Sequence, residues 1–232
     1  MATVILLRHA RSTANGSGVL AGRSLGVGLD DKGRDQASAL VERLKNVPIA
    51  AVVSSPLQRC EETLAPLLSE RQLEAVSEPD LSEVDYGAWT GRPLKDLFGE
   101  PLWKVVQQHP SAAVFPEGEG LASVQSRAVA AVRAHDARVA AEFGPRAVWL
   151  LCSHGDVIKS VLADAFGMHL DAFQRIVVDP CSVSVVSYTE MRPFVLRVND
   201  NGGDLSGVVP PPAPSSEEEK PSSDATVGGT TG

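Results

Sequence analysis

The chain of 232 residues is predicted to form a three-layer α/β/α fold, with helices on both faces of a mostly parallel sheet. Short apolar runs alternate with segments whose apolar residues recur at helical spacing. The runs are apolar throughout rather than at every second position, which is typical of strands that helices cover on both faces. A hydrophobic content of 43% and a charged content of 22% are ordinary for a globular protein.

Two strands and two helices are expected to alternate in the first third of the chain. Residues 3–7 form a β-branched apolar run that ends at Arg8-His9. Asp30 suits a helix N-cap. The helix after it carries apolar residues at the spacing i, i+3, i+4, i+7, namely Ala37, Leu40, Val41 and Leu44. A buried strand is expected at 49–53, followed by a helix over about 57–71.

The middle of the chain is expected to leave this regular pattern. Residues 86–120 contain four prolines, which interrupt any long element, so we expect a loop-rich cap with a short helix near 102–108. The pattern then resumes with a helix at 121–143, a strand at 146–152, a helix opening at 153–156, and strands at 182–188 and 194–198. Residues 1–201 are therefore predicted to form one domain. Residues 202–232 are rich in Pro, Ser, Glu and Gly and are expected to be a disordered tail.

Charge and cysteine content exclude several classes of protein. The net charge is −8, with five acids and one base in residues 202–232, so about half of it lies in the predicted tail. An acidic balance argues against binding to nucleic acid or to anionic membranes. The three cysteines form no CxxC pair, which argues against a disulfide framework or a zinc ribbon. We expect a cytoplasmic protein without a resident metal or cofactor, and nothing in the sequence indicates its oligomeric state.

Polar side chains follow three of the predicted strands where each strand ends. The segments concerned are Arg8-His9-Ala10-Arg11 with Asn15, Ser54 to Arg59, and Ser153 to Asp156; a fourth, Leu81 to Gly87, places Glu83 in a turn. An open α/β sheet builds its site beyond the carboxyl ends of its strands. Guanidinium groups suit phosphoryl oxygens, an imidazole can be a nucleophile, and a carboxylic acid can protonate a leaving oxygen. These residue types therefore indicate phosphoryl transfer. The absence of GxxxxGK[ST] and HExxH motifs argues against nucleoside triphosphates and a catalytic metal.

The four segments resemble the motifs of the histidine phosphatase superfamily, in its phosphoglycerate mutase-like branch. Leu7-Arg8-His9-Ala10 with Asn15 resembles the signature R-H-G-x(5)-N, with Ala10 in place of the usual Gly. The other three similar segments are 54–63, 81–91 and Ser153-His154-Gly155. All four occur in the family's order, and together they cover about four-fifths of the chain. The resemblance implies the family's fold, a mostly parallel sheet with an antiparallel edge strand.

The resemblance also implies a role for each matching residue. His9 would be the nucleophile that forms a phosphohistidine, and Glu83 the general acid and then the base for water. The phosphoryl oxygens would be held by Arg8, Arg59 and the second catalytic histidine, His154, with further contacts from Asn15 and from the backbone N–H near Gly155. Pro116 to Gly120 resembles the phosphatases' P-x-G-E-S, so Glu119 is expected to face substrate. Trp89 is expected to help make the leaving-group pocket partly apolar.

Each of these residues also has a purely structural interpretation. A histidine at a strand end can be a buried core residue, Arg59 and Glu62 can form a surface pair on one helix, and Glu83 can cap a turn. His109, His135 and His169 match no motif, and we interpret them as structural.

The sequence favours a metal-independent phosphomonoesterase that acts on a small phosphorylated metabolite. The alternative is a phosphoglycerate mutase-type phosphotransferase. It is disfavoured because no Arg follows Glu83 and the middle of the chain lacks the long insertion of the glycolytic mutases. A third possibility is a non-catalytic module that binds a phosphorylated ligand. Such a module needs the arginines but not the acid.

Overall fold

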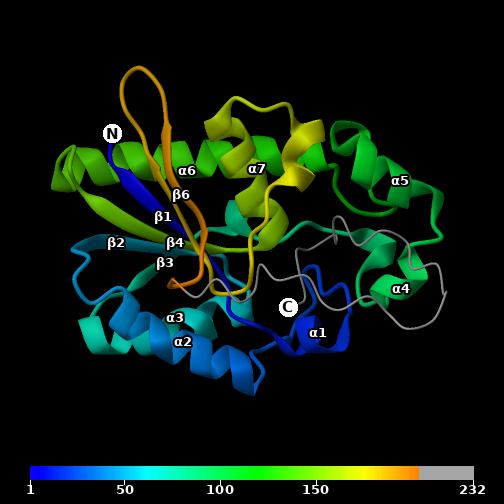
Figure 1. Cartoon of the computed structure of the whole chain (residues 1–232), viewed down its shortest axis with the longest axis horizontal. Helices are drawn as coiled ribbons and strands as arrows, with labels where there is room; N and C mark the ends of the chain where they lie inside the picture. The colour runs from blue at the N-terminus through cyan, green and yellow to red at the C-terminus, as the bar shows by residue number, and fades with distance from the viewer. Residues whose placement is uncertain (204–232) are drawn as a thin grey trace.

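A six-stranded sheet lies between two layers of helices in the computed structural model, which describes residues 1–203 (Figure 1). The strands, in the spatial order β3-β2-β4-β1-β5-β6, are β1 (Thr3–Arg8), β2 (Ile49–Ser54), β3 (Ala75–Ser77), β4 (Val148–Ser153), β5 (Val183–Ser187) and β6 (Phe194–Asp200). Strands β1 to β4 are parallel to one another. Strand β5 is antiparallel to β1, and the edge strand β6 is antiparallel to β5. The predicted fold class is confirmed.

The helices cover both faces of the sheet. The α-helices are α1 (Thr13–Ser17), α2 (Asp31–Arg43), α3 (Gln58–Arg71), α4 (Leu94–Leu97), α5 (Pro101–Gln108), α6 (Leu121–Phe143) and α7 (Gly155–Phe166). Single-turn or short 3₁₀ helices are η1 (Pro79–Leu81), η2 (Gly87–Trp89), η3 (Pro110–Ala112) and η4 (Leu170–Arg175). In Figure 1, α6 and α7 lie on one side of the sheet, and α2 and α3 lie on the other.

Alternate residues of each central strand enter two separate cores. In β1, Val4 and Leu6 belong to the core that contains residues of α6 and α7. Their neighbours Ile5 and Leu7 belong to the core beneath α2 and α3. Since side chains alternate across a strand, a strand covered on both faces must be apolar at every position. This is why the strands show continuous apolar runs in the sequence.

The predicted elements of regular length are present, whereas short ones such as α1, β3 and α4 were not predicted. Helix α6 has the predicted bounds, 121–143. Helix α1 has five residues and a Gly in its sequence, and it is held by a capping box between Ser12 and Asn15. Strand β3 has three residues, and helix α4 has four. Elements this short carry too little periodicity to be seen in the sequence.

The segment between η2 and α6 begins and ends at neighbouring positions of the backbone, and its buried residues Leu94, Leu97 and Val106 join the core beneath α6 and α7. The Ala88 N–H donates to the Pro116 carbonyl at 2.8 Å, and the Glu119 N–H donates to the Asp85 carbonyl at 2.9 Å. A Cβ atom added to Gly87 would lie 2.0 Å from the Pro116 carbonyl oxygen, so no side chain fits there. We call these paired segments, 85–88 and 116–119, the neck. Between its two sides lie η2, α4, α5 and η3. The predicted tail falls almost entirely on residues 204–232, outside the described residues.

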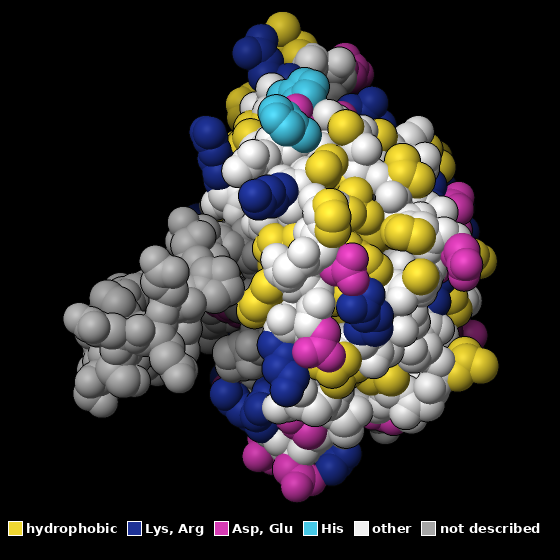
Figure 2. Space-filling view, turned by 90° about the vertical axis from the view of Figure 1, so that its right-hand side faces the viewer, with side chains coloured by type: hydrophobic (Ala, Val, Ile, Leu, Met, Phe, Trp, Pro, Cys, Tyr) yellow, Lys and Arg dark blue, Asp and Glu magenta, His cyan; other side chains and the backbone are white. Residues whose placement is uncertain are grey.

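Charges of both signs are interspersed on the end of the molecule that carries α4 and α5. Figure 2 views this end and shows Lys and Arg side chains beside Asp and Glu, with hydrophobic side chains between them. This face therefore carries no broad patch of one sign. Within residues 1–203, no helix is long and apolar enough to cross a membrane.

One buried carboxylate ties α6 to two strands of the sheet. Asp136 is fully buried, and its oxygens accept hydrogen bonds from the Ala2 N–H at 2.9 and 3.1 Å. Its Oδ1 also accepts from Trp149 Nε1 at 3.1 Å. Two buried donors on the β1 and β4 side of the interface thus depend on one acceptor group.

Replacing this carboxylate should destabilise the fold. We expect Asp136→Ala to lower the free energy of unfolding by about 2–4 kcal/mol, because two buried N–H donors lose their acceptor. Urea denaturation measures the change. Glu142→Ala is the matched control, since it removes an exposed acid from the same helix and should change stability by about 0.5 kcal/mol at most. Equal effects of the two substitutions would contradict the assignment.

Candidate active site

The pairing of β1 with β4 brings the two motif histidines together. In this parallel pair, Arg8 lies opposite Ser153, and the His9 N–H donates to the Ser153 carbonyl at 2.9 Å. His9 and His154 therefore follow their strands at the same edge of the sheet. Their ring centroids are 5.2 Å apart. The Ser55 N–H donates to the Cys152 carbonyl at 2.9 Å, which brings the second motif to the same edge.

The imidazole of His9 is held neutral with one nitrogen free to react. Its Nδ1 lies 2.7 Å from the Ala10 carbonyl oxygen, so Nδ1 carries the hydrogen and Nε2 keeps its lone pair. Burial lowers the pKa of His9 well below its usual 6.5, and the charges of Arg59 and Arg8 lower it further. A neutral imidazole with a lone pair on Nε2 is the form that a nucleophile requires.

The loop that holds His9 is fixed by the second motif. Thr63 Oγ1 accepts a hydrogen bond from the Ala10 N–H at 2.8 Å and donates to the Arg59 carbonyl at 2.6 Å. Ala10 itself is fully buried. Thr63 thereby joins α3, which carries Arg59, to the residue whose carbonyl sets the tautomer of His9.

His154 presents a second neutral imidazole to the same place. It is the N-cap residue of α7, and its Nε2 lies 2.7 Å from Ser55 Oγ. When the Ser55 hydroxyl donates this bond, Nδ1 carries the ring hydrogen. That Nδ1 is buried and has no hydrogen-bond partner within residues 1–203. Burial, followed by the charge of Arg59, lowers the pKa of His154 well below 6.5. His154 can therefore donate a neutral hydrogen bond to an anion.

Two buried guanidinium groups supply positive charge. Arg8 is fully buried and Arg59 is 2% exposed. Arg8 Nη1 donates to the Val178 carbonyl at 2.7 Å, and Arg59 Nη2 donates to the Gly22 carbonyl at 2.8 Å. Arg59 Nη1 is buried and has no hydrogen-bond partner in the described part of the chain. An unpartnered, buried guanidinium nitrogen suits a phosphoryl oxygen.

The carboxyl group of Glu83 is poised to hold a proton near neutral pH. The residue is 4% exposed, and its Oε1 accepts from the Val84 N–H at 2.9 Å. Burial and, next, the negative charge of Asp156 raise its pKa to about 7, against the lowering effect of Arg59 and Arg8. A carboxyl group with this pKa can donate a proton in one step and accept one in the next.

The remaining predicted site residues differ in what their side chains do. Asn15 Oδ1 accepts from Ser12 Oγ at 2.8 Å, so its carbonyl belongs to the cap of α1. Gly155 is the first residue of α7, as expected.

Trp89, expected to line the leaving-group pocket, and Glu119, expected to face substrate, both have protein partners in the structure. Trp89 is 2% exposed. Its ring centroid lies 5.3 Å from that of Phe115 and 6.2 Å from that of Trp103, so it packs against these two aromatic side chains. Glu119 forms ion pairs with Arg23 and Arg127.

Several buried or half-buried residues around Glu83 escaped the sequence reasoning. Asp156 is fully buried and accepts a hydrogen bond from Tyr86 Oη at 2.8 Å. Lys159 Nζ lies 3.7 Å from the other oxygen of Asp156. Asp156 directly follows His154-Gly155, so its position in the motif was a usable signal. Arg23 and Arg127 lie outside every motif, so no signal in the sequence pointed to them.

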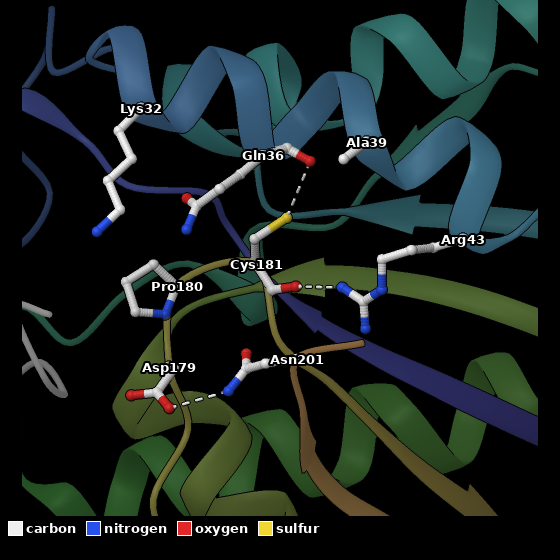
Figure 3. Close-up of a pocket in the computed structure, with 8 residues that line it drawn as sticks. All are labelled: Lys32, Gln36, Ala39, Arg43, Asp179, Pro180, Cys181 and Asn201. Atoms are coloured by element: carbon white, nitrogen blue, oxygen red, sulfur yellow. Dashed lines mark hydrogen bonds between the residues drawn. The ribbon is translucent and has the colours of Figure 1, made fainter. Parts of the chain in front are cut away.

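A separate cavity of about 380 Å³ lies between α2 and the loop that precedes β5 (Figure 3). It is lined by Lys32, Gln36, Ala39, Arg43, Asp179, Pro180, Cys181 and Asn201. None of the predicted catalytic residues lines it. Its wall nevertheless contacts the end of β1, because the Cys181 N–H lies 3.2 Å from the carbonyl oxygens of both Arg8 and His9. Within residues 1–203, no group of three or more His, Cys, Asp or Glu is arranged to hold a metal ion.

The chain is similar to proteins named as phosphatases and as probable phosphoglycerate mutases. It is 29% identical over 202 residues to phosphoserine phosphatase 1 of Hydrogenobacter thermophilus, covering 86% of this chain and 92% of that protein. It is 30% identical over 192 residues to a probable phosphoglycerate mutase, GpmB, of Yersinia pestis, covering 82% and 86% respectively. Among solved structures, a putative α-ribazole-5′-phosphate phosphatase of Escherichia coli matches with a TM-score of 0.73 and 26% identity, over 85% of this chain and 95% of that one.

The sequence model of one family covers the whole described domain. The model of the histidine phosphatase superfamily, branch 1, matches residues 4–201, which include all four motifs and every strand of the sheet except the first residue of β1. Because this model matches most of the chain, and the chain places two buried histidines at adjacent strand ends, the chain belongs to the histidine phosphatase superfamily.

Proposed function

We propose that the chain is a metal-independent phosphomonoesterase that transfers the phosphoryl group of a small phosphorylated metabolite to His9 and then to water. The observation that carries the proposal is the pairing of opposite pKa shifts in one buried site. His9 is neutral with Nε2 unprotonated, while Glu83 retains a proton up to a pH of about 7. Such a pair supplies a nucleophile and an acid at the same pH.

In the first step, Nε2 of His9 attacks phosphorus. The new N–P bond forms as the ester P–O bond breaks, and the leaving oxygen takes the proton of Glu83. Arg8, Arg59 and the Nδ1–H of His154 would hold the phosphoryl oxygens, where negative charge is concentrated. Their fixed, buried positions mean that little reorganisation is needed as the charge moves.

In the second step, water replaces His9 on phosphorus. The carboxylate of Glu83, now deprotonated, takes a proton from the attacking water as the new P–O bond forms and the N–P bond breaks. Inorganic phosphate leaves, and His9 and Glu83 return to their initial protonation states. No metal or cofactor enters this cycle.

The activities for which the relatives are named support a small substrate. They include a phosphoserine phosphatase and a putative α-ribazole-5′-phosphate phosphatase. A net charge of −8 disfavours polyanionic partners, so we propose no role for nucleic acid or membrane surfaces. The three cysteines are free, as is usual in a reducing compartment, which supports a cytoplasmic location.

A mutase is the second candidate, because a probable phosphoglycerate mutase is 30% identical to the chain. A mutase would return the phosphoryl group of phospho-His9 to a second hydroxyl rather than to water. Interconversion of 3- and 2-phosphoglycerate that depends on a bisphosphate primer, without release of phosphate, would favour it over the phosphatase.

The first prediction concerns the nucleophile. His9→Ala should lower the turnover of phosphomonoesters by about 10³-fold or more, because no other group can form the phosphoenzyme. Release of phosphate is measured over a panel of sugar phosphates, phosphoglycerates, phosphoserine and nucleotides, without added metal. Substrate labelled at phosphorus should leave acid-labile label on the wild-type protein and none on the His9→Ala variant.

His169→Ala is the matched control, since that side chain is 73% exposed and lies outside every motif. It should retain full activity. A wild-type protein that cleaves no member of the panel would refute the phosphatase. If it still binds phosphorylated ligands, and His9→Ala binds them equally well, the non-catalytic module is correct.

The second prediction concerns pH. Because the pKa of Glu83 is raised from 4.5 to about 7, its acid form persists to neutral pH and is lost above it. The kcat/KM for an alkyl phosphomonoester should therefore fall tenfold per pH unit above about 7. Glu83→Gln should lower kcat/KM by about 10²–10⁴-fold and abolish this alkaline limb. Glu61→Gln, at an exposed acid of α3, should keep both the rate and the limb. An unchanged profile in Glu83→Gln would remove Glu83 from the role.

A further inference from the structure

The carboxylate of Glu119 gathers two arginines that are far away in sequence. Its Oε1 accepts from Arg23 Nη2 at 2.9 Å and from Arg127 Nη2 at 2.7 Å, and its Oε2 accepts from Arg127 Nε at 3.0 Å. Oε1 also accepts from the Asp85 N–H at 2.8 Å. We call the three side chains of Glu119, Arg23 and Arg127 the clamp.

Both arginines of the clamp donate to the same backbone atom. Arg23 Nε lies 2.8 Å from the Glu83 carbonyl oxygen, and Arg127 Nη2 lies 3.3 Å from it. Arg127 Nη1 adds a bond to the Asp80 carbonyl at 2.6 Å, on the other side of the turn. The clamp therefore fixes the backbone of the turn that carries Glu83 from two directions.

Two of the three side chains of the clamp are largely buried, which favours stable ion pairs between them. The side chains of Arg127 and Glu119 are 15% and 19% exposed, while that of Arg23 is 40% exposed. Burial alone would raise the pKa of Glu119, but hydrogen bonds from Arg127 and from the Asp85 N–H outweigh it and lower the pKa. Glu119 is thus ionised wherever the enzyme works. A fork-to-fork contact with Arg127 restricts its direction as well as its distance.

We propose that Glu119 is a positioning residue, which acts through Arg23 and Arg127 to hold the carboxyl group of Glu83 at the leaving oxygen of the substrate. Three hydrogen bonds to Oε1 and one to Oε2 hold the carboxylate to protein groups, so we assign it to positioning rather than to substrate contact. Proton donation depends on the placement of the acid to within a fraction of an ångström. The proposal rests on the proposed function, because it assigns the clamp to the proton-donating step.

The test compares two esters that differ in their need for an acid. Phosphoserine has an alkoxide leaving group that must be protonated, whereas p-nitrophenyl phosphate has a leaving group that departs without a proton. We expect Glu119→Gln to lower kcat/KM for phosphoserine by about 10-fold and for p-nitrophenyl phosphate by about 2-fold at most. Because kcat/KM covers only the steps up to transfer to His9, slow hydrolysis of the phosphoenzyme does not obscure the comparison.

Two further variants keep the result interpretable. Arg23→Gln breaks one half of the clamp at a side chain that is 40% exposed, so it should fold normally and show the same selective loss at a smaller size, about 3-fold. Glu100→Gln is the matched control. Glu100 Oε1 pairs with Arg92 Nη1 at 2.7 Å, in the segment between the two sides of the neck, and no contact to Glu83 is involved. It should leave both esters unaffected.

The alternatives give different results. Equal losses on both esters, with a lowered melting temperature, would make the clamp a structural support only and overturn the proposal. A raised KM for phosphoserine with unchanged kcat would mean that Glu119 contacts substrate, and would also overturn it. A wild type that cleaves neither ester nor any member of the wider panel would refute the proposed function itself, together with this inference. Wild-type cleavage of both esters with no loss in the variants refutes the clamp alone.

Discussion

The site depends on the parallel pairing of β1 with β4. Arg8 lies opposite Ser153 in this register, and the His9 N–H binds the Ser153 carbonyl, so the two histidines follow neighbouring strands at the same level. A slip of one residue would turn each side chain to the opposite face of the sheet. The two cores prevent such a slip, because each accepts alternate residues of β1. The packing of ordinary apolar residues thereby sets the 5.2 Å separation of the His9 and His154 rings.

Burial at this edge of the sheet changes the pKa values of the site residues as well as stabilising the fold. Removing water favours the neutral form of every ionisable group, and it acts in opposite directions on the pKa of a histidine and of a carboxylic acid. Burial therefore favours the neutral forms of His9 and His154 and the protonated form of Glu83. Arg8 and Arg59 remain as the positive charges among these groups, a setting that suits a phosphoryl group.

Local patterns in the sequence predicted most of the fold, and they located the residues that meet at the sheet edge. Long elements such as α6 contain enough periods to be recognised, whereas α1 and β3 span too few residues. Arg23 and Glu119 are 96 positions apart, and no spacing rule joins them. The assignment of Glu119 to substrate contact followed from a local motif. Its actual partners depend on how the neck brings distant turns together, which only the folded chain reveals.

The neck has a consequence for how specificity can diverge. Its two sides are joined by main-chain hydrogen bonds, and at Gly87 they approach too closely to admit any side chain. The segment between them therefore begins and ends at neighbouring backbone positions. Insertions or substitutions at exposed positions of residues 90–114 could then change this part of the surface while His9 and Glu83 keep their places. One scaffold could in this way serve a lineage of enzymes with different metabolites and a shared reaction.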